Sequence, residues 1–374
     1  MKRILIVSMS AGLGGIEKSM IHFLSFISSM PDTCVELMLW KCKGELLDDI
    51  PSSVRIIPSP APGDIKSILL RCNIFRIFRY MSLKWQTRKG TPWLSFPKLK
   101  GKYDVAISYT QDGYSPYYVI DCVDAEKKYL WYHHGAYIHS GAGQLLDIQY
   151  YPRFTNVVAV SESIRDILIR EVPTCQPNII VINNLIDEKN IIRCSKGHCE
   201  EFSGIVDKCR LVTVGRLSYE KGQLRALEVA NALKMRNFNF LWIFVGEGPD
   251  KEACQQKVRE YGLMDSCKFV GAKTNPYPYF RCADIYVAPS YVEADPVTIQ
   301  EALILGKPII ASKIESIVSA LSKNASAVLM DFDLADSVAE SIIDNYNSFG
   351  HGNFKAEGSF TRNIEVRRNL ETLL

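Results

Sequence analysis

The sequence predicts an α/β protein with two doubly wound parallel sheets. Short apolar runs alternate with segments of helical periodicity along the chain, a pattern typical of such sheets. The chain has 374 residues, 47% hydrophobic and 23% charged, which is enough for two globular domains with separate cores. A polar stretch without clear periodicity, residues 193–210, lies between the two series of runs. We therefore expect one domain over 1–190, a second over 191–355 and a final helix over 356–374 that can cross back to the first domain.

Each series of apolar runs gives a set of candidate strands. In the first half these are 3–7, 35–40, 54–57, 105–108, 128–132, 157–160 and 179–182. In the second half they are 211–214, 241–245, 268–270, 285–288, 308–311 and 327–330. Ser163 and Asp166 are the expected capping pair of the helix after 157–160. Because doubly wound sheets bind ligands at the carboxyl ends of their strands, the loops after these runs are the candidate site.

Composition bears on location and on metal binding. No apolar run approaches the roughly 18 to 20 residues of a membrane-spanning helix, and the N-terminus lacks a signal-peptide pattern. The eleven cysteines are scattered, which favours a reducing compartment over a disulfide scaffold. We expect a cytoplasmic protein without a metal site, because Cys194, His198, Cys199 and Cys209 lack zinc-site spacing and the acids of 331–333 fit a helix cap.

Two loops of the second half carry charges suited to a nucleotide-linked substrate. Arg216 and Lys221 bracket a glycine-bearing loop, where two fixed cations can neutralise a diphosphate. Glu293 lies in a later loop, and Glu301 lies about two turns into the helix that follows it. Ionised carboxylates at these positions can accept hydrogen bonds from sugar and ribose hydroxyls. The alternatives are that Arg216 and Lys221 form a solvated cation pair and that Glu293 is an ordinary loop acid. For Glu301, the alternative is an exposed helix residue.

The first half offers a glycine turn and a pair of histidines. Gly14 and Gly15 follow the first strand and can let the backbone approach a phosphate or a sugar, or can simply form a tight turn. Glu17 stands where a P-loop or a dinucleotide fingerprint needs glycine, which disfavours NTPases and NAD-dependent enzymes. His133 and His134 follow a later strand, and a buried core histidine is the alternative to a ligand contact there.

Residues 66–102 form a basic segment with ten Lys or Arg and no Asp or Glu. Because the chain has a formal net charge of +3, the remainder carries about −7. The mixture of cations with Trp85, Trp93 and aliphatic residues fits docking on an anionic membrane leaflet or a lipid-linked acceptor. A helix packed on the first domain with a solvated basic rim is the alternative. Nucleic acid is disfavoured, because no binding motif accompanies the charge.

The order of several motifs resembles the family 4 glycosyltransferases. These motifs are GGIEKS, WYHHG, VAVSESIRD, INNLID, VGRLSYEKG, VGEGP, KFVGAK and EADPVTIQEALILGKPIIAS. The resemblance spans nearly the whole chain and is strongest over 211–312. It implies the GT-B fold, in which two Rossmann-like domains face each other across a cleft, with the acceptor on the first domain and the donor on the second. It also implies a retaining enzyme that uses a nucleotide-sugar without a metal or other cofactor.

The resemblance implies roles for the charged residues of the second half. Arg216 and Lys221 match the diphosphate-binding pair of the family. Glu293 matches its contact to the donor sugar, and Glu301 matches its ribose contact. In this assignment, Arg216, Lys221, Glu293 and the first-domain residue His133 form the catalytic set.

Further positions match the family through backbone or position. Gly14 and Gly15 match the glycine turn that faces the reaction centre, and His133 matches the histidine near the transferred sugar. Val270 and Gly271 match the segment whose backbone meets the base. The Asn-x-x-Asp signature near the interdomain region is matched by Asn184 and Asp187, for which we expect a structural role.

The loop after Glu293 departs from the family pattern. Ala294 and Asp295 replace the common glycine and bulky apolar residue, and an added carboxylate beside phosphates is electrostatically unfavourable. Asp295 is therefore expected either to cap the following helix or to bind a donor hydroxyl. The donor-binding positions continue through Pro296 and Val297, where the positive end of the helix can receive an anion.

These observations predict a retaining hexosyltransferase that moves a sugar from a UDP- or GDP-linked donor to a glycan or lipid-linked acceptor. The expected setting is polysaccharide or glycolipid synthesis at the inner face of a membrane. Two alternatives remain open. A nucleotide-sugar epimerase of related fold would convert a donor without an acceptor. A non-catalytic glycan-binding or scaffold module is favoured by the departure at 294–295.

Overall fold

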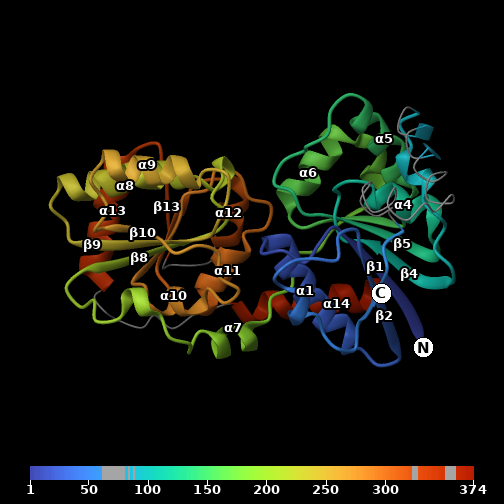
Figure 1. Cartoon of the computed structure of the whole chain (residues 1–374), viewed down its shortest axis with the longest axis horizontal. Coiled ribbons are helices and arrows are strands. Elements are labelled where there is room, and N and C mark those ends of the chain that lie inside the picture. The colour runs from blue at the N-terminus through green and yellow to red at the C-terminus, as the bar shows by residue number, and fades with distance from the viewer. Residues whose placement is uncertain (61–80, 83–84, 87–88, 322–326, 350–358) are drawn as a thin grey trace. The chain divides into compact units, whose positions relative to one another are not determined.

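The computed structural model describes the chain except residues 61–80, 83–84, 87–88, 322–326 and 350–358. The chain forms two compact units (Figure 1). The first contains residues 1–12, 16–183 and 370–374, and the second contains residues 13–15 and 184–369. The polar stretch 193–210 lies in the second unit, where its Phe202 is buried.

The first unit is built on a seven-stranded sheet with the order β3-β2-β1-β4-β5-β6-β7. All of its strands pair in parallel. The strands are β1 (Lys2–Ser8), β2 (Thr33–Leu39), β3 (Arg55–Ile57), β4 (Lys102–Ser108), β5 (Asp124–Tyr132), β6 (Asn156–Ala159) and β7 (Ile179–Val181). The strand order reverses between β1 and β4. The loops after these two strands therefore flank the point where such sheets bind ligands.

The helices of the first unit connect these strands. Those described are α1 (Gly15–Ser28), α4 (Ser115–Cys122), α5 (Ala142–Tyr150) and α6 (Glu162–Glu171), with 3-10 turns η1 (Leu47–Asp49), η2 (Pro92–Ser95), η3 (Tyr151–Arg153) and η4 (Pro173–Asn178). The expected cap of α6 was wrong. Ser161, not Ser163, precedes this helix, and its Oγ accepts a hydrogen bond from the backbone N–H of Ile164 at 3.4 Å. Ser163 lies inside the first turn because the helix begins at Glu162.

The second unit repeats the same topology with six parallel strands in the order β10-β9-β8-β11-β12-β13. The strands are β8 (Cys209–Val214), β9 (Phe240–Val245), β10 (Cys267–Phe269), β11 (Ile285–Ala288), β12 (Ile309–Ser312) and β13 (Ala327–Met330). Here the order reverses between β8 and β11. The loops after β8 and β11 are therefore the predicted ligand-binding loops of this unit.

Helices cover both faces of this second sheet, with α8 and α9 on one side and α10 on the other (Figure 1). Trp242 belongs to the core on one face and Ile243 to the core on the other, as alternation along a buried strand requires. The elements are α7 (Glu188–Cys194), η5 (Glu200–Phe202), η6 (Tyr219–Lys221), α8 (Gln223–Met235), α9 (Lys251–Glu260), α10 (Tyr277–Cys282), α11 (Val297–Ile304), α12 (Glu315–Leu321), α13 (Ala335–Phe349) and α14 (Ser359–Leu373).

Each apolar run predicted as a strand corresponds to a strand, and the predicted doubly wound α/β class is confirmed. The largest boundary difference is at β5, which begins at Asp124 rather than at residue 128. Three of the four residues of this early part, DAEK, are charged, so hydrophobicity alone does not mark them. Among the described helices, none combines the length and the apolar character needed to cross a membrane.

A chain of buried hydrogen bonds links three central strands of the second unit. Trp242 Nε1 on β9 donates to Thr213 Oγ1 on β8 at 3.0 Å. The Thr213 hydroxyl in turn donates to the carbonyl of Val287 on β11 at 2.8 Å. Thr213 is only 4% exposed, so water cannot replace these partners.

Replacing Thr213 with valine should lower the free energy of unfolding by about 1–3 kcal/mol, because the buried indole N–H loses its acceptor. Differential scanning calorimetry would detect this as a lower transition temperature. Thr213→Ser is the matched control, since it keeps the hydroxyl and should retain most of the stability. A Thr213→Val protein that unfolds at the wild-type temperature would contradict this account.

Candidate active site

The loops after β8 and β11 bring two of the predicted site residues together. Lys221 Nζ donates to both carboxylate oxygens of Glu293, at 2.7 and 2.8 Å. Ser290 Oγ donates to Glu293 Oε1 at 2.7 Å. The Glu293 side chain is 11% exposed and that of Lys221 is 32% exposed. A largely buried carboxylate and a partly exposed ammonium therefore form one fixed pair at the switch point of the sheet.

Both members of this pair keep unused hydrogen-bonding capacity. An ammonium has three N–H donors, of which Lys221 directs two to Glu293. A carboxylate has about four acceptor positions, and the Glu293 carboxylate accepts from Lys221 and Ser290. Arg216 is exposed, and its guanidinium forms no hydrogen bond or ion pair with the described residues. The loops can therefore offer cationic donors to a phosphate and an acceptor to a hydroxyl group.

The two loops approach each other closely through their backbones. The backbone N–H of Tyr291 donates to the carbonyl of Glu220 at 2.8 Å. Gly222 has φ of +68°, and a Cβ at this position would lie 2.1 Å from the carbonyl oxygen of Pro289. Only glycine fits this backbone conformation and this contact. The glycine that follows Lys221 thus allows the lysine loop to reach the Glu293 loop.

Arg225, which the sequence analysis did not identify, braces the same loops. Its guanidinium donates to the carbonyls of Pro289 and Ser290 and to Ser312 Oγ, each at 2.6 Å. The guanidinium carbon also lies 3.8 Å from the centre of the Tyr291 ring. An arginine in the first turn of α8 was the only sequence signal, and nothing in the sequence indicated that its partners lie on a loop some 65 residues later.

The helix start predicted at Asp295 and Pro296 is present, since α11 begins at Val297 with Pro296 as its N-cap residue. Asp295 is 8% exposed, and its Oδ2 accepts a hydrogen bond from the backbone N–H of Asn184 at 2.8 Å. Asp295 was expected either to cap the following helix or to bind a donor hydroxyl, and neither role predicted this hydrogen bond. It ties the loop before α11, which includes Ala294, to the INNLID segment.

The last residue of that segment, Asp187, is the N-cap of α7. Its Oδ1 accepts a hydrogen bond from the backbone N–H of Asn190 at 3.0 Å. The Asn-x-x-Asp motif thus uses its first residue to anchor the loop before α11 and its last to start a helix. Both contacts are structural, as expected.

Glu301 is fully buried, so the alternative of an exposed helix residue was wrong. It is the fifth residue of α11, a little more than one turn from the start rather than two. Tyr277 OH donates to its Oε1 at 3.1 Å. Burial first, and then the charge of Glu301, raise the pKa of Tyr277 well above its usual value. The ribose contact of Glu301 stays a prediction.

Val270 and Gly271 directly follow β10 at the carboxyl edge of the sheet. The backbone N–H of Val270 donates to the carbonyl of Phe244 at 3.1 Å, and the carbonyl of Gly271 accepts from Gly246 N–H at 2.9 Å. Gly271 has φ of +75°, a conformation that favours glycine. The segment is therefore held by its neighbours in an irregular turn, and its contact to a base stays a prediction.

The helix α1 begins at Gly15, directly after Gly14. Neither glycine has a positive φ. A Cβ added to Gly15 would meet no described atom within 4 Å, so packing against those atoms does not require glycine there. The tight-turn alternative therefore lacks support at Gly15.

His133 lies after β5 and is 7% exposed. Its backbone N–H donates to Gln111 Oε1 at 3.1 Å, and its ring centroid lies 4.8 Å from that of Tyr109. His134 instead makes a local contact, in which the backbone N–H of Ala136 reaches its Nδ1 at 3.3 Å. The structure thus places His133 in a packed position at the edge of the first sheet.

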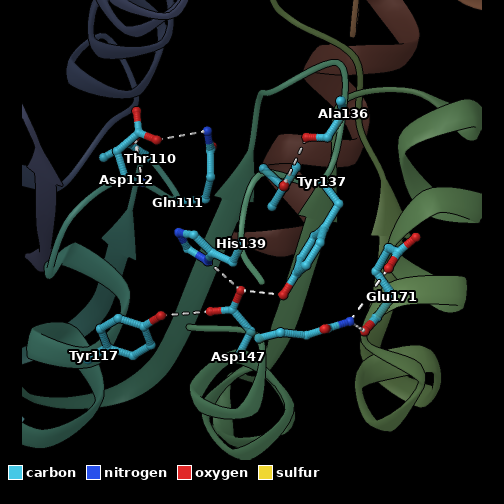
Figure 2. Close-up of polar contacts among 11 residues, drawn as sticks. Thr110, Gln111, Asp112, Tyr117, Ala136, Tyr137, His139, Asp147 and Glu171 are labelled. Carbon is cyan, nitrogen blue, oxygen red and sulfur yellow. Dashed lines mark hydrogen bonds and ion pairs between the residues drawn. The ribbon is translucent and has the colours of Figure 1, made fainter. Parts of the chain in front are cut away.

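A buried carboxylate, which the sequence analysis missed, organises the loop 133–141. Asp147 on α5 is fully buried. Tyr117 OH donates to its Oδ1 at 2.7 Å, Tyr137 OH donates to its Oδ2 at 2.7 Å, and His139 Nδ1 lies 2.6 Å from the same Oδ2 (Figure 2). The hydrogen bond to Asp147 raises the pKa of His139. An aspartate between the apolar residues of the run LLDI was the available sequence signal.

Much of the basic segment, residues 66–102, lies outside the described residues. In the described part, its two tryptophans have different environments. Trp93 is buried, stacks on Tyr117 with ring centroids 4.5 Å apart and donates its Nε1 to Asp121 Oδ2 at 2.9 Å. The prediction that Trp93 lies on a docking surface was therefore wrong. Trp85 is 55% exposed, with Lys89 Nζ 3.7 Å from its ring centre. In the described ranges, no group of three or more metal-ligating side chains is assembled.

Comparisons with known proteins show which family model and which proteins this chain is similar to. Residues 201–348 match the family model described as glycosyl transferases group 1. This segment contains Lys221, Glu293, Arg225 and both switch-point loops of the second unit. The match covers the site of the second unit and leaves the first unit outside it.

Two curated relatives match a similar part of the chain. The lipopolysaccharide core biosynthesis glycosyltransferase LpsD of Rhizobium meliloti (strain 1021) is 31% identical over 121 residues, which are 32% of this chain and 34% of that protein. The amylovoran biosynthesis glycosyltransferase AmsK of Erwinia amylovora is 30% identical over 128 residues, or 32% of this chain and 31% of that protein. The matches thus span about one third of these relatives.

Solved structures match the whole chain in fold. Anabaena HepE in complex with UDP and glucose has a TM-score of 0.70 at 17% identity and covers 100% of both chains. Sucrose-phosphate synthase from Thermosynechococcus elongatus has a TM-score of 0.71 at 15% identity and covers 100% of this chain and 98% of that chain. The chain has the GT-B fold, and the fold and the family match together support a glycosyltransferase.

Replacing Arg225 with lysine should lower the free energy of unfolding by about 2–4 kcal/mol, because an ammonium cannot reproduce the planar set of donors to three oxygens. Thermal unfolding measures the loss. Arg259→Lys, on the exposed face of α9, is the matched control and should unfold at the wild-type temperature. Equal transition temperatures for the two variants would show that Arg225 does not brace the loops.

Stability should also depend on pH through His139. Its folded-state pKa is raised, so its stabilising effect is fully present below about pH 6.5, the ordinary histidine value, and is lost as pH rises through the folded-state pKa. The charges acting on the ring are those of Asp147 and Asp112. The transition temperature of His139→Gln should therefore fall further below wild type at pH 5.5 than at pH 9. A difference that is independent of pH would contradict this linkage.

Proposed function

We propose that this protein is a retaining glycosyltransferase that moves a hexose from a UDP- or GDP-linked sugar to a glycan or lipid-linked acceptor. The observation that carries the proposal is the Lys221–Glu293 pair at the β8–β11 switch point, within the segment that matches group 1 glycosyl transferases. The names of relatives in lipopolysaccharide and amylovoran synthesis support polysaccharide or glycolipid synthesis. A structure of HepE with UDP-glucose supports a nucleotide-sugar donor.

In this proposal, the second unit stabilises the leaving group. Negative charge grows on the nucleoside diphosphate as the bond to the sugar breaks, and preorganised cations lower the energy of that state. Lys221 would direct its remaining N–H to a phosphate oxygen, and the exposed Arg216 would supply a second cation. Because Ser290 and Lys221 hold the Glu293 carboxylate in place, its remaining lone pair can orient a donor-sugar hydroxyl. No metal or other cofactor enters this scheme.

The remaining assignments follow the same reasoning. The start of α11 at Pro296 and Val297 would add backbone N–H groups to the diphosphate site. Val270 and Gly271 would meet the base, and Glu301 the ribose. The space left at Gly15 favours a backbone approach to the donor, and the packed position of His133 favours its predicted role beside the transferred sugar.

The proposal includes a location at the inner face of a membrane. Its support is the charge of residues 66–102, which carry ten cations and no acid. Each Lys or Arg near an anionic leaflet contributes about 1 kcal/mol to binding. The exposed Trp85 would add an interfacial anchor.

A panel of UDP-, GDP- and ADP-sugars tests the activity, with release of nucleoside diphosphate and transfer to added glycans as readouts. Lys221→Ala should lower kcat/KM at least about 100-fold because a charge in contact with the leaving group is lost. Glu293→Gln should lower it as well, since the amide donates where the carboxylate accepts.

Lys257→Ala is the matched control, because it removes an ion pair between α8 and α9 and should change turnover by less than about two-fold. No binding, hydrolysis or transfer across the panel would refute the proposal. Conversion of a donor into its epimer without acceptor would identify the epimerase alternative instead. Retention is read from the anomeric configuration of the product.

A further inference from the structure

The segment 194–201, which precedes β8, runs alongside helix α10 in the second unit. Just before this helix, Asn275 Nδ2 donates to the carbonyl of Cys194 at 2.9 Å. Gly197 packs on the first turn of the helix, since a Cβ added to it would lie only 3.1 Å from Pro278 Cγ. The segment and the helix are thus in contact over several residues, and the contacts advance along both in the same order.

The contact continues to the end of α10, where two cysteines meet. Tyr279 OH donates to Glu201 Oε1 at 2.8 Å, and the sulfur of Cys199 lies 3.9 Å from Oε2 of the same carboxylate. Cys282 follows Tyr279 by three residues and therefore lies on the same face of the helix. Cys199 and Cys282 are free thiols that share a hydrogen bond and pack in one core cluster. Their two sulfur atoms are therefore neighbours in the folded protein.

The surroundings give the two thiols different chemistry. The hydrogen bond from Cys199 lowers the pKa of Cys282, and burial opposes this shift. The positive charges of Arg210 and Lys307 lower it further. Lys307 Nζ lies beside Cys282, because it donates to the carbonyls of the two flanking residues at 2.6 and 2.8 Å. The same hydrogen bond, together with burial, raises the pKa of Cys199. Cys282 therefore supplies a nucleophilic thiolate, whereas Cys199 stays a thiol.

Exposure divides the two residues in the same way. Cys282 is partly exposed, whereas Cys199 is 5% exposed. Oxidation of a cysteine requires thiolate character and access. A small oxidant therefore reacts first with Cys282, and Cys199 is placed to react with the product.

We propose that Cys199 and Cys282 form a reversible oxidation site, at which hydrogen peroxide converts the two thiols into a disulfide. The Cys282 thiolate attacks one peroxide oxygen and becomes a sulfenic acid, and the released hydroxide takes up the proton that Cys282 lost on ionisation. The Cys199 sulfur then attacks the sulfenic sulfur, its proton leaves with the hydroxyl group as a second water, and the S–S bond forms. A free thiol such as glutathione reverses the step by exchange. This site goes beyond the proposed function and does not depend on it.

The location of the pair predicts what the disulfide changes. Cys282 ends α10 just before the amino end of β11, and Cys199 precedes β8. The Lys221–Glu293 pair lies in the loops after these two strands, at the opposite edge of the sheet. The disulfide therefore joins the segment 194–201 to α10 and leaves the loops of the candidate active site as they are. We expect oxidation to act on stability.

Peptide mapping of the full-length protein tests the pair directly. Trypsin gives the peptides 194–196, 197–208 and 282–313, each with one cysteine. Reduced protein is treated with hydrogen peroxide, the remaining thiols are alkylated, and the protein is digested without reductant. Peptides 197–208 and 282–313 should appear joined, about 2 Da lighter than the sum of their thiol forms, and dithiothreitol should separate them.

Two results of this mapping would overturn the proposal. One is full alkylation of Cys199 and Cys282 at a peroxide dose that oxidises the exposed Cys42. The other is a disulfide that joins Cys282 to a different cysteine. Because the mapping uses the wild-type protein, neither result depends on how a variant folds.

Serine variants assign the order of the two steps, since serine keeps a hydrogen-bond donor at either position. In Cys199→Ser the sulfenic acid at Cys282 has no thiol to react with. Dimedone, which traps sulfenic acids, should therefore label peptide 282–313 at least about ten-fold more than in wild type. In Cys282→Ser, peptide 197–208 should stay unlabelled. Labelling of Cys199 in that variant, or no added label on Cys282 in Cys199→Ser, would contradict the assigned roles.

Thermal unfolding gives an independent readout. Oxidised wild type should unfold about 5 °C or more above the reduced protein, because the cross-link restricts the unfolded chain. Cys194→Ser is the matched control and should show the same rise, since Cys194 lies on the same segment and its thiol donates to Asn190 Oδ1 at 3.3 Å. Cys282→Ser should show no rise. A rise in Cys282→Ser equal to that of wild type would overturn the proposal.

Discussion

The site of the second unit depends on the Lys221–Glu293 ion pair. The pair joins the loops after β8 and β11 at the point where the strand order of the sheet reverses. Isolated partly buried charges would be costly, so each charge of the pair stabilises the other. The pair forms because Gly222 lets one backbone approach Pro289 and because Arg225 fixes the carbonyls of the other loop. A glycine and an arginine outside the pair thus hold its two loops together.

The fold was predictable because each strand is a short apolar run, and parallel sheets bury such runs on both faces. The order of strands predicted the charged loops at one edge of the sheet, where the structure brings Lys221 and Glu293 together. Their direct contact was not predictable, since it depends on rotamers and on a pair 72 residues apart. The cap of α6 was misassigned because Ser163 and Asp166 have the spacing of a capping box, whereas the residue three positions after the actual cap, Ser161, is Ile164. Burial of Glu301 was missed because a charged helix residue is exposed by default.

The first unit shows a different limit of sequence reasoning. The motif WYHHG draws attention to His133, but the side chains that hold its loop come from α4, α5 and the loop itself. Asp147 is separated from Tyr117 by 30 residues and from His139 by eight, spacings with no periodic meaning. Only the packed structure shows three donors converging on one carboxylate. A buried charge with a full set of donors fixes geometry more firmly than a surface charge can.

The two units differ in the sign of the charge they offer at their ligand-binding edges. The second presents Arg216 and Lys221, and the first presents Asp112 with an imidazole held by Asp147. A cationic edge favours the diphosphate of a donor, whereas negative charge disfavours a phosphate. The edge of the second unit is therefore the one whose charges suit an anionic ligand.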